Sequence, residues 1–303
     1  MTTAGLTQAS PAEVLRRLQL KVFRRLDGLL QGDYQGLIPG HGSEPGETRL
    51  YEPGDDVRRI DWNVTARARE VHLRQPIADR ELELSMVVDM SASLDFGTAI
   101  TTKRELAISA ASAIALLASR GGNRIGATVV SGAAMRTYPP RPGREALLAL
   151  LHQLVTADVG DGQGPADLAT ALERVAKAAR RRGMVVLVTD FLDESAWDRP
   201  LRALSHRHDV LAVEIVDPRE LELPDVGVIS LIDPETGRHR TVSTANAKLR
   251  ARYAEAAARQ RNEIRERLRR SGAAHLQLRT DRDWLVDFAR FVSSRKRLVG
   301  VGG

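Results

Sequence analysis

No cysteine occurs among the 303 residues, so disulfide bonds and metal sites built from thiolates are excluded. Long apolar runs are missing as well: the longest helix-like run, residues 108–119, is too short and too rich in serine to span a bilayer. Residues 1–30 contain neither the apolar segment nor the cleavage signal of a secretory peptide. We therefore expect a soluble, cytoplasmic protein without a transmembrane segment.

Lysine is scarce, although the chain is basic. Of its 45 basic residues only five are lysines, and the formal net charge is +6. Such a charge is compatible with nucleic-acid binding. The arginines, however, are spread along the chain beside acidic residues, and no basic patch interleaved with aromatic residues stands out. A nucleic-acid-binding protein is therefore an alternative supported by charge alone, and we expect no specific nucleic-acid partner.

The composition changes twice along the chain, which suggests three segments. Residues 1–31 combine a tail with a basic amphipathic helix, whose apolar residues recur at helical spacing. Such a helix either contacts an anionic membrane peripherally or packs its apolar face on the rest of the protein. Residues 32–81 are punctuated by glycine and proline, which predicts a turn-rich β segment.

From residue 82 to residue 303, apolar strands alternate with amphipathic helices. The start of one helix is marked by the capping box from Thr102 to Glu105, and two strands joined by a Gly-Ala turn follow that helix. This alternation predicts an α/β domain, with a doubly wound, mostly parallel sheet and helices on both faces. We expect further helices at its C-terminal end.

Polar residues follow two of the predicted core strands. Asp89, Ser91 and Ser93 come at and after the end of one strand, and Asp190 ends another. In an open α/β sheet, ligands bind beyond the carboxyl ends of the strands. Carboxylate and hydroxyl oxygens suit a magnesium-like ion. The spacing therefore suggests a metal or ligand site, and the alternative is that the serines only cap a helix.

Two stretches of the chain resemble known families. The run DMSAS, residues 89–93, resembles the Asp-x-Ser-x-Ser signature of von Willebrand factor A-like domains, and Asp190 resembles the second aspartate of their metal-ion-dependent adhesion site. Residues 51–74, YEPGDDVRRIDWNVTARAREVHLR, resemble the block that defines the domain of unknown function 58 family. These are prokaryotic proteins often encoded beside MoxR-type AAA+ ATPases.

This resemblance implies a fold, an ion and partners. The fold is the von Willebrand factor A-like, doubly wound α/β domain, and the partners are a MoxR-type ATPase and an unknown client protein. The ion is Mg²⁺, and the ligands that the resemblance implies for it are Asp89, Ser91, Ser93 and Asp190.

One position departs from that adhesion site. Its usual threonine comes from a Gly-Gly-Thr-Asp-Leu-like loop, whereas this chain reads GQGPADL, with Ala166 in the threonine position. The adjacent Asp167 is the residue that would substitute as a ligand. Two outcomes stay open: a site that binds Mg²⁺ with the help of Asp167, or a site whose ion is weak or absent.

These features support two functions of different class besides nucleic-acid binding. The first is a non-enzymatic interaction module, in which the loops at Asp89, Ala166 and Asp190 present a surface to a partner during assembly or maturation of a client complex. The alternative is a metal-dependent phosphoesterase or nuclease that uses Asp89, Asp190 and Asp193. Such chemistry requires several carboxylates around two ions. We therefore favour the interaction module and expect no enzymatic activity.

A charged cluster in the turn-rich segment is the other candidate site. It is either a partner-binding surface or an internal ion-pair network around a buried Trp62, because buried charges are normally paired. The charged residues of this cluster are Arg58, Arg59, Asp61 and Arg67.

Overall fold

A computed structural model of the chain describes residues 25, 29, 48–52, 55–57, 60–68, 70–74, 82–157, 166–232 and 239–300. Its centre is a six-stranded sheet in the order β10-β7-β6-β3-β4-β5. The strands are β3 (Glu83–Asp89), β4 (Arg124–Ser131), β5 (Ala134–Arg141), β6 (Gly183–Thr189), β7 (Asp209–Val216) and β10 (Ala274–Arg279).

The sheet is mostly parallel, as predicted. Strands β10, β7, β6, β3 and β4 run parallel to one another, and β5 at the edge pairs antiparallel with β4. The hairpin between β4 and β5 turns at Gly132 and Ala133. The φ of Gly132 is 56°, in the left-handed region that glycine adopts at little cost. The predicted Gly-Ala turn is therefore confirmed.

Helices cover both faces of the sheet. One face carries α3 (Lys103–Arg120), α4 (Arg144–Thr156) and α8 (Trp284–Gly300), and the other carries α5 (Leu168–Ala178), α6 (Asp198–Ser205) and α7 (Ala247–Ser271). Successive side chains of a strand point to opposite faces, so a central strand serves two cores. Met86 and Val88 lie in the core with α3, whereas Val87 lies in the core with α5 and α6. The predicted doubly wound α/β fold is confirmed.

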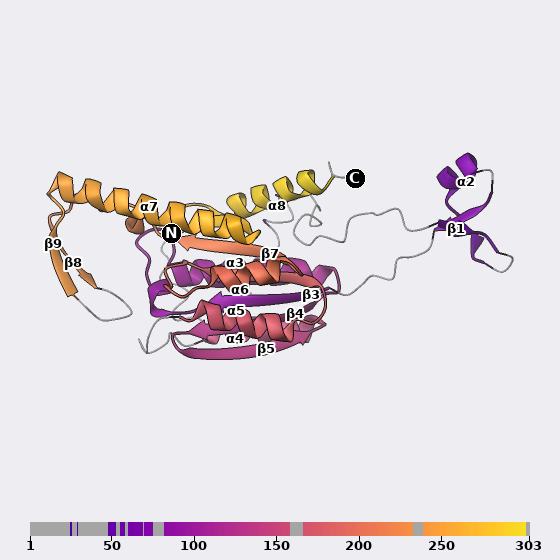
Figure 1. Cartoon of the computed structure of the whole chain (residues 1–303), viewed down its shortest axis with the longest axis horizontal. Coiled ribbons are helices and arrows are strands. Elements are labelled where there is room, and N and C mark those ends of the chain that lie inside the picture. Colours follow the sequence, from indigo (N-terminus) through magenta and orange to yellow (C-terminus); the bar gives the residue numbers. More distant parts are fainter. Residues whose placement is uncertain are drawn as a thin grey trace.

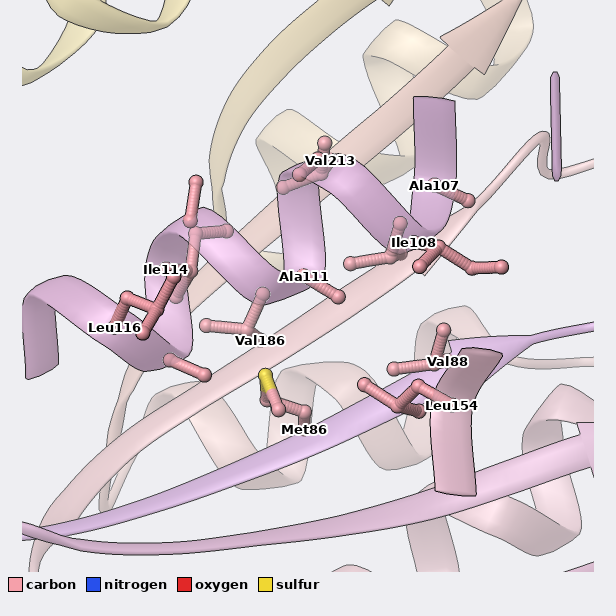
Figure 2. Close-up of a cluster of buried hydrophobic side chains, with 14 of the residues drawn as sticks. Met86, Val88, Ala107, Ile108, Ala111, Ile114, Leu116, Leu154, Val186 and Val213 are labelled. Carbon is pink, nitrogen blue, oxygen red and sulfur yellow. The ribbon is translucent and has the colours of Figure 1, made fainter. Parts of the chain in front are cut away.

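α3 is the main helix of its face. Its predicted capping box is present, because the side chains of Thr102 and Glu105 each accept a hydrogen bond from the backbone amide of the other. The helix is rich in alanine, so it packs close to the sheet, where its side chains meet Met86, Val186 and Val213 from three strands (Figure 2). Apolar burial, worth about 25 cal/mol for each Å², is the main term that holds these layers together.

The block that resembles the family forms a small unit. β1 (Thr48–Leu50) pairs antiparallel with β2 (His72–Arg74), and α2 (Trp62–Ala68) lies between them in the sequence. Trp62 is 69% exposed, so the interpretation that buries Trp62 inside an ion-pair network is wrong. The physical reason is that α2 buries none of its residues, and one two-stranded sheet encloses too little volume to cover an indole.

The predicted N-terminal helix falls mostly outside the described residues. Arg25 and Leu29 are helical and exposed, and Arg25 forms an ion pair with Asp283, just before α8. The segment boundaries expected after residues 31 and 81, and the peripheral membrane contact, stay predictions. Within the described ranges, no helix combines the length and the hydropathy needed to cross a bilayer.

A second small sheet lies near the start of α7. β8 (Val228–Ile232) and β9 (His239–Ser243) pair as an antiparallel hairpin, and residues 233–238 between them are outside the described residues. The hairpin and the N-terminal end of α7 extend away from the central sheet (Figure 1). The buried residues of α7 run from Ala257 to Ser271, so most of its packing on the domain comes from this part.

Candidate functional site

The sheet grows in two directions from the pair β3 and β6. From β3 the chain continues to β4 and β5 on one side, and from β6 it continues to β7 and β10 on the other. The carboxyl ends of β3 and β6 therefore flank the switch point at which such sheets bind ligands. Asp89 is the last residue of β3, and Asp190 directly follows β6, with Val88 opposite Val188 in the register. The two aspartates therefore lie at the carboxyl ends of neighbouring strands.

Asp89 is buried and held by two donors. Its Oδ1 atom accepts a hydrogen bond from the Ser91 amide at 2.9 Å, and its Oδ2 atom accepts one from the Thr189 hydroxyl at 2.6 Å. Burial, together with the charge of Asp190, raises the pKa of Asp89 to about 6, and the hydrogen bonds counter only part of this effect. Motif spacing does not identify Thr189, because only the pairing of β6 with β3 brings its hydroxyl to Asp89.

The two serines lie at η3 (Ala92–Leu94), directly after β3. Both are buried, and their hydroxyl oxygens are 3.1 Å apart. The Ser93 hydroxyl helps to lower the pKa of Asp190, and the Ser91 hydroxyl helps to lower that of Asp89. Ser91 occupies the N-cap position of η3, yet its side chain makes no capping hydrogen bond there. The interpretation of Ser91 as a helix cap is therefore wrong. Both serines belong with Asp89 and Asp190 to one group of side chains, which we call the strand-end site.

The turn after β6 is shaped by side chains of the same site. The Thr189 hydroxyl accepts a hydrogen bond from the Phe191 amide at 3.2 Å, and Asp190 Oδ1 accepts one from the Leu192 amide at 3.0 Å. Phe191 has a φ of 58°, which is uncommon for a residue with a side chain. Its ring centroid lies 5.0 Å from that of the buried Trp197, and this contact helps to hold the turn.

A buried lysine completes the strand-end site. Lys103 Nζ donates a hydrogen bond to Asp190 Oδ2 at 2.8 Å and a second one to Glu220, and the side chains of Lys103 and Asp190 are each 1% exposed. Burial lowers the pKa of Lys103, but the charges of Asp190 and Glu220 more than offset it, and this pKa lies above its ordinary value. Burial also raises the pKa of Asp190, yet Lys103 and the hydrogen bonds bring it below its ordinary value.

The charged network continues into α7. Arg261 is 6% exposed and donates to the Asp190 carbonyl at 2.8 Å, to Glu214 at 3.1 Å and to Glu220 at 2.9 Å. Glu214, on β7, also bonds two polar side chains of β10. Motif spacing identifies neither Arg261 nor Lys103, because their partners are 41 to 117 residues away in the sequence. The local signal is weak: a lysine directly after a helix N-cap.

Asp167 caps α5 with both of its carboxylate oxygens. Oδ1 accepts a hydrogen bond from the Thr170 amide at 2.8 Å, and Oδ2 accepts one from the Thr170 hydroxyl at 2.6 Å. The neighbouring Ala166 is buried and offers no side-chain oxygen. Asp193 accepts hydrogen bonds from Ser195 and from the first amide of α5. The expected role of Asp167 as a substitute ligand therefore has no support in this geometry.

The oxygen atoms at the strand ends are not arranged to coordinate a magnesium ion. Mg²⁺ takes six oxygen ligands in near-octahedral geometry. Here the Lys103 ammonium bonds one oxygen of Asp190, a backbone amide bonds the other, and position 166 supplies no hydroxyl. Across the ranges that the structure describes, no three His, Asp or Glu residues gather in an arrangement that could hold a metal. Magnesium binding stays a prediction from the spacing of these residues and from the family resemblance.

The predicted partner-binding cluster is described only in part. Arg58 and Arg59 lie outside the described residues. Asp61 is 8% exposed and caps α2, because its Oδ1 atom accepts from the amides of Asn63 and Val64 at 3.0 and 3.2 Å. Asp61 therefore has a structural role. Partner binding by the cluster stays a prediction, to which its remaining described member, Arg67, contributes an exposed charge in the last turn of α2.

The loop between η3 and α3 carries two exposed apolar side chains next to the charged site. Phe96 is 40% exposed and Ile100 is 59% exposed. The Phe96 ring centroid lies 5.9 Å from Lys103 Nζ, and the Phe96 carbonyl accepts a hydrogen bond from the Lys103 amide. Thr98 donates from its amide and its hydroxyl to Asp217, which follows β7. We call residues 95–102 the anchored loop, because the hydrogen bonds of Thr98 fix its middle while Phe96 and Ile100 stay exposed.

Solved structures of similar fold share little sequence with the chain. The conserved hypothetical protein BatB of Bacteroides thetaiotaomicron is 12% identical with a TM-score of 0.45, over 71% of this chain and 99% of that one. An aerotolerance-related membrane protein of Bacteroides fragilis is 13% identical with a TM-score of 0.46, over 72% and 99%. The SpRpn10 VWA domain is 13% identical with a TM-score of 0.38, over 68% and 93%. These likenesses concern the fold alone.

The chain has relatives in mycobacteria. The uncharacterized protein Rv1480 of Mycobacterium tuberculosis is 54% identical over 286 residues, 94% of this chain and 90% of that protein. The uncharacterized protein MAV169 of Mycobacterium avium is 45% identical over 163 residues, 54% of this chain and 96% of that protein. The family model described as "Protein of unknown function DUF58" matches residues 47–263, which include most of the central domain. The chain belongs to the DUF58 family, as the block at residues 51–74 predicted.

Proposed function

We propose that this protein is a non-enzymatic interaction module that works with a MoxR-type AAA+ ATPase in the assembly or maturation of a client complex. Membership of the DUF58 family and the doubly wound sheet support a module of this kind. The ATPase enters through the resemblance of residues 51–74 to proteins often encoded beside such enzymes. The observation that carries the proposal is the anchored loop, which exposes Phe96 and Ile100 at the strand-end site.

The anchored loop has the properties of a contact surface. Phe96 and Ile100 expose apolar area beside polar groups, a combination typical of protein interaction sites. The bonds of Thr98 to Asp217, and of the Ile100 amide to the Thr280 carbonyl, hold the backbone in place. An ordered loop loses less conformational entropy on binding than a flexible one. The loop therefore offers a preorganised apolar contact to a partner protein.

The phosphoesterase or nuclease alternative gains no support from the geometry. Metal-dependent phosphoester hydrolysis of this kind requires carboxylates that coordinate two metal ions about 4 Å apart. Instead, Asp190 is paired with Lys103, and Asp193 bonds Ser195 and the start of α5. These side chains are engaged within the chain. The interaction module therefore explains the described contacts with fewer assumptions.

The nucleic-acid alternative depends on the net positive charge of the chain. In the structure, several arginines form ion pairs with nearby acidic residues. Arginines on several elements are paired with acids of the same chain, which reduces the positive potential available to phosphates. Examples are Arg267 with Asp198, Arg279 with Asp281, and Arg295 with Asp209.

Co-purification of the full chain with a MoxR-type ATPase from the same organism tests the proposal. We expect the wild-type chain to capture the ATPase, and Phe96→Ser or Ile100→Ser to weaken binding by about tenfold or more, because loss of an apolar anchor removes at least about 1.4 kcal/mol. The matched control is Val228→Ser on β8, which removes a 70% exposed apolar side chain elsewhere. Binding constants measured by biolayer interferometry compare the variants.

Two results would count against this proposal. Failure of the wild-type chain to bind the ATPase would remove the partnership. Weakening by Trp62→Ser alone would place the contact on the small unit that contains α2, where Trp62 is exposed, and not on the anchored loop.

A further inference from the structure

We infer that Lys103 is the permanent cation of the strand-end site, and that this site works without a divalent metal ion. In the adhesion site that the resemblance implies, Mg²⁺ supplies the positive charge between the acidic strand ends. In this chain the Lys103 ammonium supplies it from within the fold, 2.8 Å from Asp190 Oδ2.

Both aspartate carboxylates accept hydrogen bonds from groups of the chain itself. Two carboxylates as close as Asp89 and Asp190 repel each other unless a cation, a proton or strong donors intervene. Asp190 receives the Lys103 ammonium on one oxygen and the Leu192 amide on the other. Asp89 receives a hydroxyl and an amide. No oxygen of either carboxylate is left without a donor, so groups of the chain itself occupy the positions where an ion would bind.

The lysine is built into the site and does not reach it by chance. Its backbone amide bonds the Phe96 carbonyl, and the capping box at Thr102 fixes the start of α3 one residue before it. A buried ammonium is costly unless it is paired, and here it meets two carboxylates, those of Asp190 and Glu220. The ring of Phe96 lies 5.9 Å from Nζ, which adds a cation–π contact.

A divalent ion would have to compete with this arrangement. An ion bound to Asp190 would lie close to the Lys103 ammonium, and the two positive charges would repel each other. Displacement of Lys103 would leave a charged side chain, now 1% exposed, without its partner. The alanine at position 166 also withholds the hydroxyl that the usual site contributes. The positive charge of Lys103, the burial of its side chain and the missing hydroxyl at position 166 all favour the lysine over the metal.

The wild-type chain gives the first test. We expect Mg²⁺ or Mn²⁺ to leave its melting temperature unchanged relative to NaCl of equal ionic strength, because an ion stabilises a protein only when it binds the folded state. Titration of Mn²⁺ followed by electron paramagnetic resonance should show no saturable binding. Saturable binding in the wild type that Asp89→Asn abolishes would overturn the inference.

Removal of the lysine gives the second test. Lys103→Met keeps most of the length of the side chain and removes its charge, so we expect a lower melting temperature and a new, saturable rise of this temperature with Mn²⁺. The double variant with Asp89→Asn should lose that response. Lys177→Met, the same change at an exposed lysine of α5, is the matched control and should show no response.

The variant is informative even when it folds poorly. If Lys103→Met precipitates without metal, its refolding yield is measured with and without Mn²⁺, and a higher yield with Mn²⁺ supports the inference. A folded Lys103→Met chain that ignores Mn²⁺, or a yield that Mn²⁺ does not change, counts against it. These measurements use the protein alone, so the result of the ATPase capture does not affect them.

Discussion

At Asp89, burial and a neighbouring carboxylate outweigh two hydrogen bonds. The pKa of this group rises from 3.8 to about 6, so the folded protein favours the neutral acid. A group whose pKa is raised by folding stabilises the protein fully below its unfolded pKa, and this contribution is lost as the pH rises through the folded pKa. The stability supplied by Asp89 is therefore present below about pH 4 and lost by about pH 6 to 7.

Asp89→Asn tests this pH dependence. Asparagine is uncharged at every pH and keeps an oxygen for the Ser91 amide. Between pH 4 and pH 7 we expect the free energy of unfolding of the wild type to fall relative to the variant by roughly 3 kcal/mol, from a shift of about two pKa units at about 1.4 kcal/mol each. Urea unfolding across this range measures the difference. A difference independent of pH would show that Asp89 titrates near its ordinary pKa.

At the scale of elements, polar residues at helix starts act as caps. Asp61 caps α2, Thr102 and Glu105 form the capping box of α3, and Asp167 caps α5. A side chain that accepts a bond from an amide of the first turn satisfies a donor that the helix itself leaves open. For Asp167 this local role competes with the ligand role that its place beside Ala166 suggested. The two roles predict different consequences of mutation.

Asp167→Ala distinguishes these roles. Loss of the cap should lower the free energy of unfolding by about 1 kcal/mol, and Asp167→Asn, which can still cap, should lower it by less. Both variants should capture the ATPase like the wild type. Chemical denaturation and the capture assay provide the two measurements. An Asp167→Ala chain of unchanged stability that no longer captures its partner would assign Asp167 to the functional surface.

At the scale of the whole molecule, one network of buried charged side chains connects helices and strands that are far apart in the sequence. Arg261 of α7 bonds the end of β6, Glu214 of β7 and Glu220 of η4 (Pro218–Glu220), and Glu220 also bonds Lys103 of α3. Helices from both faces of the sheet therefore share acidic partners at its carboxyl edge. Removing one member of such a network leaves the others buried and unbalanced.

Arg261→Met should therefore be strongly destabilising. We expect a loss of about 3–5 kcal/mol in the free energy of unfolding, the usual cost of breaking a buried ion pair from one side. The control is Arg259→Met on the same helix, because Arg259 is 61% exposed and pairs with the exposed Glu255, an ion pair worth less than about 1 kcal/mol. Thermal and urea unfolding compare the variants. Equal effects of the two changes would show that the network does not hold α7 in place.

The sequence by itself determined the elements and their order. Apolar runs predicted β3 and β6, and the capping box predicted the start of α3. The alternation of strands and helices predicted the doubly wound sheet, and the topology of such a sheet placed Asp89 beside Asp190. These inferences succeed because the backbone bonds of a helix, and the side-chain periodicity of helices and strands, depend on residues only a few positions apart.

Only the tertiary structure decided how the site is neutralised and which residues face solvent. Lys103 meets Asp190 across 87 residues and Glu220 across 117, and no local pattern encodes either contact. The exposure of Trp62 likewise depends on how little of the chain packs around α2. A motif of aspartates and serines specifies oxygen donors at a strand end. The cation that balances them depends on which helix docks there, and docking is a long-range property of packing and charge.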